Sequence, residues 1–290
     1  MRPNNRLWIF SSATCVVAVL NCLGALGAAV DVTGAAPSSA LLGSAGASPS
    51  RLWTLRASPF KPASKAQSSP AVQLALAPAV VADNTLTDQE KKDGWRLLFD
   101  GRTLDGWQTS SQQPSKTGVE EGALNPHGCG GYMLIHKEQW ENFKLALDFK
   151  LSKACNSGVF LRTSPLTPRP GKDVGFNGLE IALDDTATAG YTDTGALYDL
   201  SKPTKNALRP LGEWNHLEIK ANKSVIEVKL NGEQVNRIDL DKFTDKNQRP
   251  DGTPHKFDVV YKDHPRRGYI GLQDHGSNCW FKNIKLKKLD

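Results

Sequence analysis

The sequence predicts an all-β protein, a sandwich or jelly roll built from short antiparallel strands. Roughly a dozen short segments with apolar alternation occur over about 200 residues, which is typical of such folds. Turn dipeptides such as Asp100-Gly101 and Asn231-Gly232 separate these segments. No long amphipathic helix is found among them, which agrees with an all-β fold.

The N-terminal third of the chain is predicted to lie outside the fold. Residues 1–29 have the pattern of a secretory signal peptide, because Arg2 and Arg6 flank an apolar run that ends in small residues. The run is long enough that an uncleaved membrane anchor is the alternative. Residues 30–85 are rich in Ala, Ser and Pro, which predicts a disordered linker before a folded domain over 86–290. We therefore expect an exported protein, either periplasmic or extracellular.

Composition excludes several classes of function. The chain has 290 residues, a formal net charge of +6 and 39% hydrophobic residues, which excludes a multi-pass membrane protein. No block of Lys and Arg is interleaved with aromatics, so a nucleic-acid partner is not expected. Cys129, Cys155 and Cys279 lie in the folded part, and three cysteines allow at most one internal bridge. Which pair would form it is left open, and the absence of C-x-x-C disfavours a structural zinc site.

The predicted elements begin with a short helix, for which Thr87 and Glu90 provide a capping pattern. Asn231-Gly232 predicts a type I′ hairpin, since both central residues of that turn need positive φ. Alternating apolar residues predict the strands Trp95–Phe99, Tyr132–His136, Phe143–Leu151, Ser157–Arg162, Leu179–Asp184, Trp214–Ala221, Ser224–Leu230, Gln234–Asp239, Gly268–Gln273 and Cys279–Leu286.

Three of these strands share an unusual polar face. With a two-residue period, each has one apolar face for a core and one face of polar and small residues. Small residues between polar groups leave room, as the floor of a groove would. The alternative is that these are ordinary solvated outer faces. The polar residues concerned are Asn156 and Arg162, Glu180 and Asp184, and Gln273 and His275.

The carboxylates on this face do not suit a standard glycosidase. Glu180 and Asp184 are four residues apart along a strand, roughly 13 Å at 3.3 Å per residue. Retaining glycosidases need carboxyls about 5 Å apart, and inverting ones up to about 9.5 Å. Together with Asp185 and His275, these carboxylates could instead bind Ca²⁺ or Mg²⁺, although no contiguous loop has a calcium-binding spacing. Tyr198 could stack on a sugar ring or belong to the core.

Several segments of the chain resemble a known family. They are, in order, WRLLFDGRTLDGWQ, NSGVFLR, GLEIALDD, TGALY, GEWN, GYIGLQDHG and WFKNI. The chain resembles the 3-keto-disaccharide hydrolase domain family, formerly a domain of unknown function. The resemblance implies a two-sheet antiparallel jelly-roll sandwich of the concanavalin A-like type. It also implies a glycoside or oligosaccharide substrate that has been oxidised to a ketone at C3.

Such a substrate allows elimination followed by hydration rather than double displacement. A base removes the acidified C2 proton, the C1 substituent leaves, and water adds back. His275 is the predicted base, with Glu180 as the competing choice, and Arg162 or a metal would stabilise the enolate. Loss of His275 should then slow turnover at least ~100-fold. The predicted sugar-binding residues are Asn156, Asp184, Tyr198 and Gln273. The alternatives are a non-catalytic, lectin-like carbohydrate-binding module and a surface adhesion domain.

Overall fold

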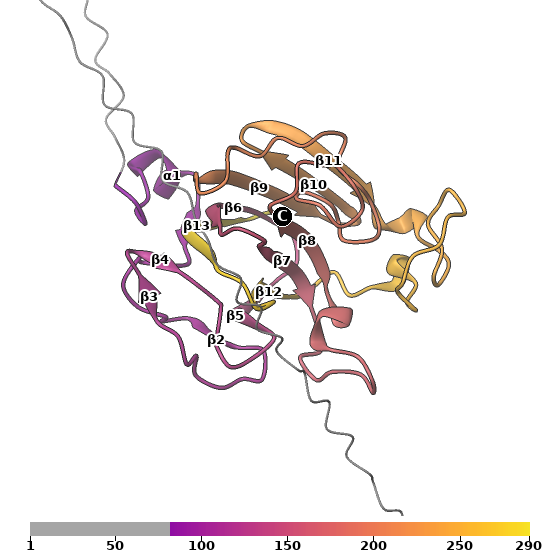
Figure 1. Ribbon diagram of the computed structural model, residues 1–290, viewed down its shortest axis with the longest axis horizontal. Helices are drawn as coiled ribbons and strands as arrows, with labels where there is room; N and C mark the ends of the chain where they lie inside the picture. Colours follow the sequence, from indigo (N-terminus) through magenta and orange to yellow (C-terminus); the bar gives the residue numbers. More distant parts are fainter. Residues whose placement is uncertain (1–81) are drawn as a thin grey trace, which may run out of the picture. The chain divides into compact units, whose positions relative to one another are not determined.

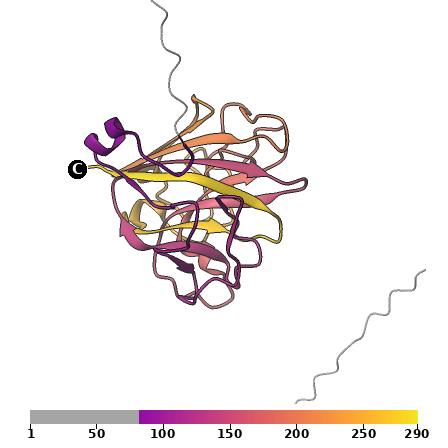
Figure 2. The same ribbon diagram turned by 90° about the vertical axis from the view of Figure 1, so that its left-hand side faces the viewer.

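Two antiparallel sheets make up the part of the chain that the computed structural model describes, residues 82–290 (Figures 1 and 2). The predicted signal peptide and nearly all of the predicted linker lie outside these residues. The smaller sheet has the strand order β2 (Trp107–Thr109), β5 (Met133–Trp140), β12 (Gly268–Gln273), β7 (Asn156–Thr163), β8 (Leu179–Asp184). Within residues 82–290, no helix is long and apolar enough to span a membrane.

The larger sheet has eight strands. Its order is β11 (Glu233–Asp239), β10 (Val225–Leu230), β9 (Asn215–Asn222), β6 (Phe143–Leu151), β13 (Cys279–Lys288), β4 (Ala123–Leu124), β3 (Val119–Glu120), and β1 (Trp95–Leu97) pairs separately with β13. All strand pairs in both sheets are antiparallel. The predicted all-β, two-sheet antiparallel jelly-roll sandwich is therefore confirmed.

The local sequence signals form as predicted. Helix α1 (Asp88–Lys92) begins at the N-cap Thr87, and Glu90 completes a reciprocal capping box. Asn231 and Gly232 both have positive φ, 52° and 85°, as a type I′ turn between β10 and β11 requires. Strand β5 runs four residues past its predicted end at His136, because a register shift against β12 accommodates residues that do not alternate.

The core lies between the two sheets. It contains the apolar face of β6, including Phe143, Leu147 and Phe149, and the facing residues of β8 and β12, including Ile181 and Leu272. These are the faces that the two-residue period assigned to the core. Burial of this apolar area is the main contribution that stabilises the sandwich.

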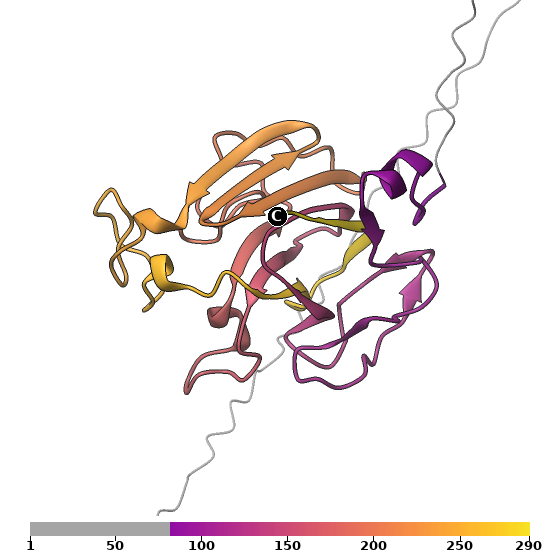
Figure 3. The same cartoon turned by 180° about the vertical axis from the view of Figure 1, so that it is seen from behind.

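The outer face of the smaller sheet carries a second, smaller apolar cluster. Met133 and Phe160 point outward from this sheet and pack against Leu166 and Val174. The latter two belong to the connection between β7 and β8, which contains the 3₁₀ helix η1 (Val174–Asn177). A second long connection contains η2 (Leu240–Lys242) and η3 (Tyr261–Asp263) and extends beyond the sheets, as Figure 3 shows from behind. These two connections build walls on the smaller sheet.

Candidate functional site

A cavity of about 120 Å³ opens on the outer face of the smaller sheet. Strands β7, β8 and β12 form its floor, and the two long connections form its walls. The residues with polar side chains that line it are Tyr132, Asn156, Asp173, Glu180, Tyr198, Lys256, Tyr261, Gln273 and His275. Five of the sequence-predicted residues are thus brought together: Asn156, Glu180, Tyr198, Gln273 and His275.

Glu180 lies at the floor of this cavity. Gly158 on β7 lies diagonally across from it, two residues from its register partner Phe160. A Cβ atom at Gly158 would lie 2.6 Å from the Glu180 Oε1, so glycine leaves the space that the carboxylate occupies. Within residues 82–290 the carboxylate has no hydrogen-bond donor. Burial raises the pKa of Glu180 to about 8, an effect that the ammonium of Lys256 opposes and the carboxylate of Asp173 reinforces. Glu180 can therefore exchange a proton near neutral pH.

Tyr132 and Gln273 form a hydrogen-bonded pair beside Glu180. The Gln273 amide nitrogen donates to the Tyr132 hydroxyl oxygen at 2.9 Å, which leaves the hydroxyl proton free to donate in turn. Burial raises the pKa of Tyr132, and the negative charge of Glu180 adds to the effect, so the phenol stays protonated. The Gln273 Oε1 is buried without a partner in the described chain. The pair offers a ligand one donor and one acceptor.

Aromatic rings and a lysine form the opposite wall. The backbone nitrogen of Tyr198 donates to the Glu180 carbonyl at 2.9 Å, which places Tyr198 next to the floor. The Lys256 Nζ lies 4.2 Å from the centre of the Tyr198 ring, a cation–π distance. Behind them, the fully buried Tyr261 has a hydroxyl without a hydrogen-bond partner among the described residues. Unpaired buried polar atoms are rare in proteins, and here two of them, on Tyr261 and Gln273, line one cavity.

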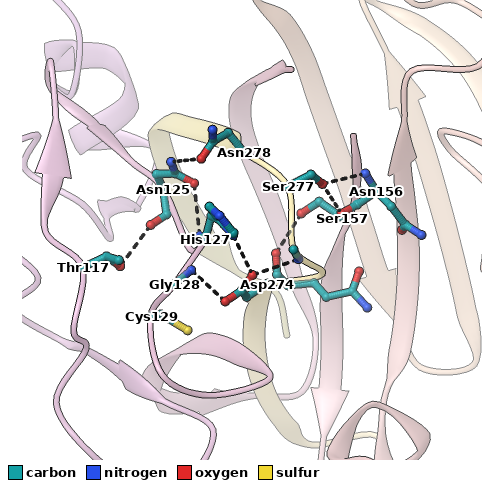
Figure 4. A network of polar contacts seen from close by, with 12 residues as sticks. Thr117, Asn125, His127, Gly128, Cys129, Asn156, Ser157, Asp274, Ser277 and Asn278 are labelled. Carbon is teal, nitrogen blue, oxygen red and sulfur yellow. Dashed lines mark hydrogen bonds and ion pairs between the residues drawn. The ribbon is translucent and has the colours of Figure 1, made fainter. Parts of the chain in front are cut away.

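His275 lies at the rim rather than at the floor. It sits in the turn after β12 and is exposed to solvent. The turn is held on both sides (Figure 4). The Asp274 carboxylate accepts from the backbone nitrogen of Gly128 at 2.8 Å, and Ser277 exchanges two hydrogen bonds with the backbone of Asn156 at 2.9 and 3.0 Å. The backbone around His275 is therefore anchored, although its imidazole makes no hydrogen bond within residues 82–290.

Arg162 does not lie in the cavity. The prediction that places it there as an enolate-stabilising group is therefore wrong. Strand β7 has a register shift against β12, and Arg162 there adopts a positive φ of 52°, which breaks the two-residue period. Its fully buried guanidinium donates to the backbone oxygens of Glu141 and Lys223 at 2.8–3.1 Å. Burial lowers the pKa of Arg162 to about 10. The side chain connects turns at one end of the sandwich.

Asp184 lies beyond the cavity, which corrects its predicted place in the sugar site. It is on the same face of β8 as Glu180, but its carboxylate accepts from the Thr194 nitrogen and the Thr186 hydroxyl, both at 2.8 Å. Asp185 accepts instead from the Ala154 nitrogen at 2.6 Å. The expected calcium or magnesium ligands therefore do not converge. In the described part of the chain, no three His, Cys, Asp or Glu side chains are arranged to hold a metal ion.

Sequence reasoning missed four of the polar lining residues: Tyr132, Asp173, Lys256 and Tyr261. Three of them lie in connections that carry no periodic pattern, so nothing in the sequence indicated which strand they approach. The exception is Tyr132, which precedes β5 directly. The two-residue period would turn it toward the core with Leu134, whereas it contacts the Gln273 amide on the outer side.

Comparison with known proteins places this geometry in a family. Residues 94–287 match the model of the 3-keto-alpha-glucoside-1,2-lyase-like domain. A protein named 3-keto-disaccharide hydrolase from Bacteroides thetaiotaomicron is 29% identical over 230 residues, which cover 68% of this chain and 79% of that protein.

Solved structures show the same relationship. A crystal structure of a "putative glycosyl hydrolase" from Parabacteroides distasonis is 30% identical, with a TM-score of 0.58, and the match covers 67% of this chain and 99% of that one. A second structure of the same description and organism is 25% identical, with a TM-score of 0.60, and covers 72% and 100% of the two chains. The matches include nearly all of those structures, so the similarity extends over the whole sandwich.

Proposed function

Because the chain belongs to the 3-keto-alpha-glucoside-1,2-lyase-like domain family, we propose that it is a carbohydrate hydrolase that cleaves 3-keto-glycosides at the cavity around Glu180. The observation that carries the proposal is this carboxylate, which is partly buried, has no hydrogen-bond donor in residues 82–290 and has a pKa raised to about 8. A general base works best when its pKa lies near the operating pH. Such a group suits removal of a carbon-bound proton.

The reaction begins at C2 of the oxidised ring. Glu180 takes the C2 proton, and the electron pair of that C–H bond moves to the C3 carbonyl oxygen to form an enolate. The enolate then collapses, the C1–O bond breaks, and the leaving alcohol takes a proton. Water adds to C1 of the resulting 1,2-unsaturated ketone while C2 regains a proton, so the net change is hydrolysis. A second carboxylate is not needed, which agrees with the placement of Asp184 outside the cavity.

The remaining lining residues can stabilise the charge that develops. Lys256 is a positive group at the wall, and an ammonium near the C3 oxygen would stabilise the enolate. The free hydroxyl proton of Tyr132 offers a neutral donor to the same region. Lys256 takes the role that the sequence assigned to Arg162. His275 at the rim is suited to move a proton to or from the leaving group or water.

The size of the cavity limits what part of the substrate it encloses. A volume of about 120 Å³ is below the ~300 Å³ at which ligand pockets for larger molecules begin. We infer that one oxidised sugar ring enters the cavity, and that the leaving group stays outside near Asn156 and His275. A leaving group outside the cavity makes no contact with its floor, so we expect 3-keto-lactose and 3-keto-trehalose both to be cleaved.

The test is incubation of the purified chain with 3-keto-lactose and 3-keto-trehalose, with and without a chelator. We expect each substrate to release free sugar at the same rate with and without the chelator. The Glu180→Gln variant, which keeps the shape of the side chain, should release it about 1,000-fold more slowly. If no 3-keto-glycoside is cleaved while the unoxidised disaccharides bind, the protein is a lectin-like module instead.

A second measurement separates elimination from direct displacement. Elimination passes through a 1,2-unsaturated 3-ketone, which absorbs in the ultraviolet and loses the C2 hydrogen. In D₂O, we expect deuterium at C2 of the released 3-keto sugar. Product without deuterium at C2, formed at the full rate, would exclude the proposed mechanism while leaving the substrate class intact.

A further inference from the structure

Two of the three cysteines in the described chain lie side by side at the edge of the site. Cys279 begins β13 and pairs with Leu151 at the end of β6. The Ser152 nitrogen donates to the Asn278 oxygen at 3.1 Å, and a tight turn then returns the chain, as the Cys155 nitrogen donates to Ser152 at 3.2 Å. This turn brings Cys155 back over the strand end where Cys279 lies.

The thiols share their surroundings. Cys155 is 3% exposed and Cys279 is fully buried, and the Ser277 hydroxyl lies 3.8 Å from the Cys155 sulfur. A hydrogen bond from the Cys279 thiol lowers the pKa of Cys155, whereas burial raises the pKa of Cys279. Both side chains belong to the same buried cluster, and Ser277, two residues before Cys279, reaches the Cys155 sulfur, so the two cysteines lie at one strand end. Cys155 is the one with greater thiolate character.

Cys129 lies in a different part of the site region. Its thiol contacts the Gly131 carbonyl oxygen at 3.4 Å, in the connection between β4 and β5. In Figure 4 it lies on the other side of Asp274 from Ser277. Its pKa is raised, chiefly by burial, so it is a poor nucleophile.

We propose that Cys155 and Cys279 form a disulfide when the chain meets a disulfide oxidant, and that Cys129 stays a free thiol. The Cys155 thiolate attacks one sulfur of the oxidant and releases the other as a thiol, which leaves a mixed disulfide. Cys279 then loses its proton and attacks the Cys155 sulfur, so a second thiol leaves. Two electrons and two protons pass to the oxidant, whose disulfide is reduced. The burial of both sulfurs means that the bond forms during folding or local opening.

The bond would fix one edge of the cavity. It connects the β6–β7 turn, next to Asn156, to the start of β13, just after the turn that carries His275. The hydrogen bonds of Ser277 already join these segments, and a covalent link would hold them when those bonds open. This inference does not depend on the proposed reaction, because it concerns only which sulfurs meet.

Peptide mapping tests the pairing directly. The full chain is oxidised with glutathione disulfide, blocked with iodoacetamide without reduction, digested and analysed by mass spectrometry. We expect one linked peptide pair that contains Cys155 and Cys279, and an alkylated Cys129. A Cys129→Ser variant should give the same linked pair. A link from Cys155 or Cys279 to any other cysteine, or full alkylation of both, would overturn the proposal.

Thermal unfolding provides an independent readout that does not require proteolysis. A native bridge that closes a long loop should raise the melting temperature by about 5–10 °C for a domain of this size. We expect dithiothreitol to remove that difference in the unmodified chain and in Cys129→Ser. Cys279→Ala, which keeps a small side chain at the buried position, should melt at the same temperature with and without dithiothreitol. Equal sensitivity of Cys279→Ala and the unmodified chain to dithiothreitol would contradict the assignment.

Discussion

The outer faces of the two sheets differ in the partners of their charged side chains. On the larger sheet, charged side chains pair across neighbouring strands. Glu227 lies 3.1 Å from Lys220 and 3.4 Å from Arg237, and the His216 Nδ1 lies 2.6 Å from Asp148. On the smaller sheet, Glu180 has no hydrogen-bond donor among residues 82–290, and Lys256 rests on an aromatic ring. Both faces are polar in sequence, but the carboxylates named on the larger sheet have charged partners, whereas Glu180 has none in the described chain.

This difference separates a solvated face from a candidate site. Exposed ion pairs contribute about 0–1 kcal/mol each and leave their members in ordinary protonation states. A carboxylate that is buried without donors is unfavourable for folding, so it is retained where its shifted pKa has a use. The comparison therefore predicts that substitutions on the smaller sheet change chemistry, while matched substitutions on the larger sheet change nothing measurable.

The largest effect is expected at Glu180. Replacing it by Gln removes the base and keeps the volume, so turnover of 3-keto-lactose should fall about 1,000-fold, within the 10²–10⁴ range of a lost acid–base group. Glu227→Gln on the larger sheet is the matched control and should keep full activity. The measurement is steady-state release of free sugar, with circular dichroism to verify the fold. Equal activity of the two variants would remove the distinction between the faces.

Replacement of Arg162 tests whether this residue stabilises the fold or takes part in the reaction. Its loss leaves the backbone oxygens of Glu141 and Lys223 without their donor, each worth about 1–3 kcal/mol when buried. We expect Arg162→Met to lower the free energy of unfolding by about 2–4 kcal/mol, measured by urea titration. The exposed control, Arg237→Met, should change it by less than ~0.5 kcal/mol. Turnover per folded molecule should stay normal. If Arg162→Met instead lowered kcat without lowering stability, Arg162 would have a role in the reaction.

Arg162 also shows what the sequence could and could not predict. Faces of regular strands followed from the two-residue period, and Glu180, Gln273 and Gly158 lie where that period puts them. The period fails where a bulge adds a residue, because a bulge leaves no reliable mark in the sequence. Arg162 lies on such a bulge, so its side chain turns away from the predicted groove.

The positions of residues in the long connections could not be predicted from the sequence, for a different reason. Lys256 and Tyr261 belong to the connection between β11 and β12, residues 240–267, which has no periodicity and whose path is set by the surfaces it packs against. Asp184 illustrates a third limit. Its face was predicted correctly, yet its distance along β8 takes it past the cavity to Thr194. Alternation of polar and apolar residues predicts which face of the sheet a strand residue lies on. It does not predict which loop residues pack over that face.

Lys256 should show a smaller effect than Glu180. Without its ammonium, the enolate loses one stabilising charge, so Lys256→Met should slow turnover about 10–100-fold. The exposed Lys229→Met on the larger sheet is the control and should have no effect. Because the positive charge of Lys256 opposes the rise in the Glu180 pKa, its removal should raise that pKa further.

The pH profile tests this coupling. If Glu180 is the base, kcat/KM should rise with pH and level off above about 8, since only the ionised carboxylate accepts a proton. In Lys256→Met this limb should move to higher pH, while Lys229→Met should follow the unmodified chain. A slower Lys256→Met with an unshifted profile would mean that Lys256 positions the sugar and does not act on Glu180.

His275 should have a smaller effect on turnover than Glu180 or Lys256, although the sequence alone favoured it as the base. The side chain is exposed at the rim and makes no hydrogen bond within the described residues, whereas Glu180 occupies the floor where a sugar ring would sit. We expect His275→Ala to slow turnover less than ~10-fold, because water can replace a solvent-exposed proton carrier. The exposed His127, whose imidazole contacts Asp274 at 3.3 Å in the neighbouring loop, provides the control His127→Ala. A loss of ~100-fold or more in His275→Ala, with Glu180→Gln less affected, would exchange the two roles and make the rim, not the floor, the place where the C2 proton is taken.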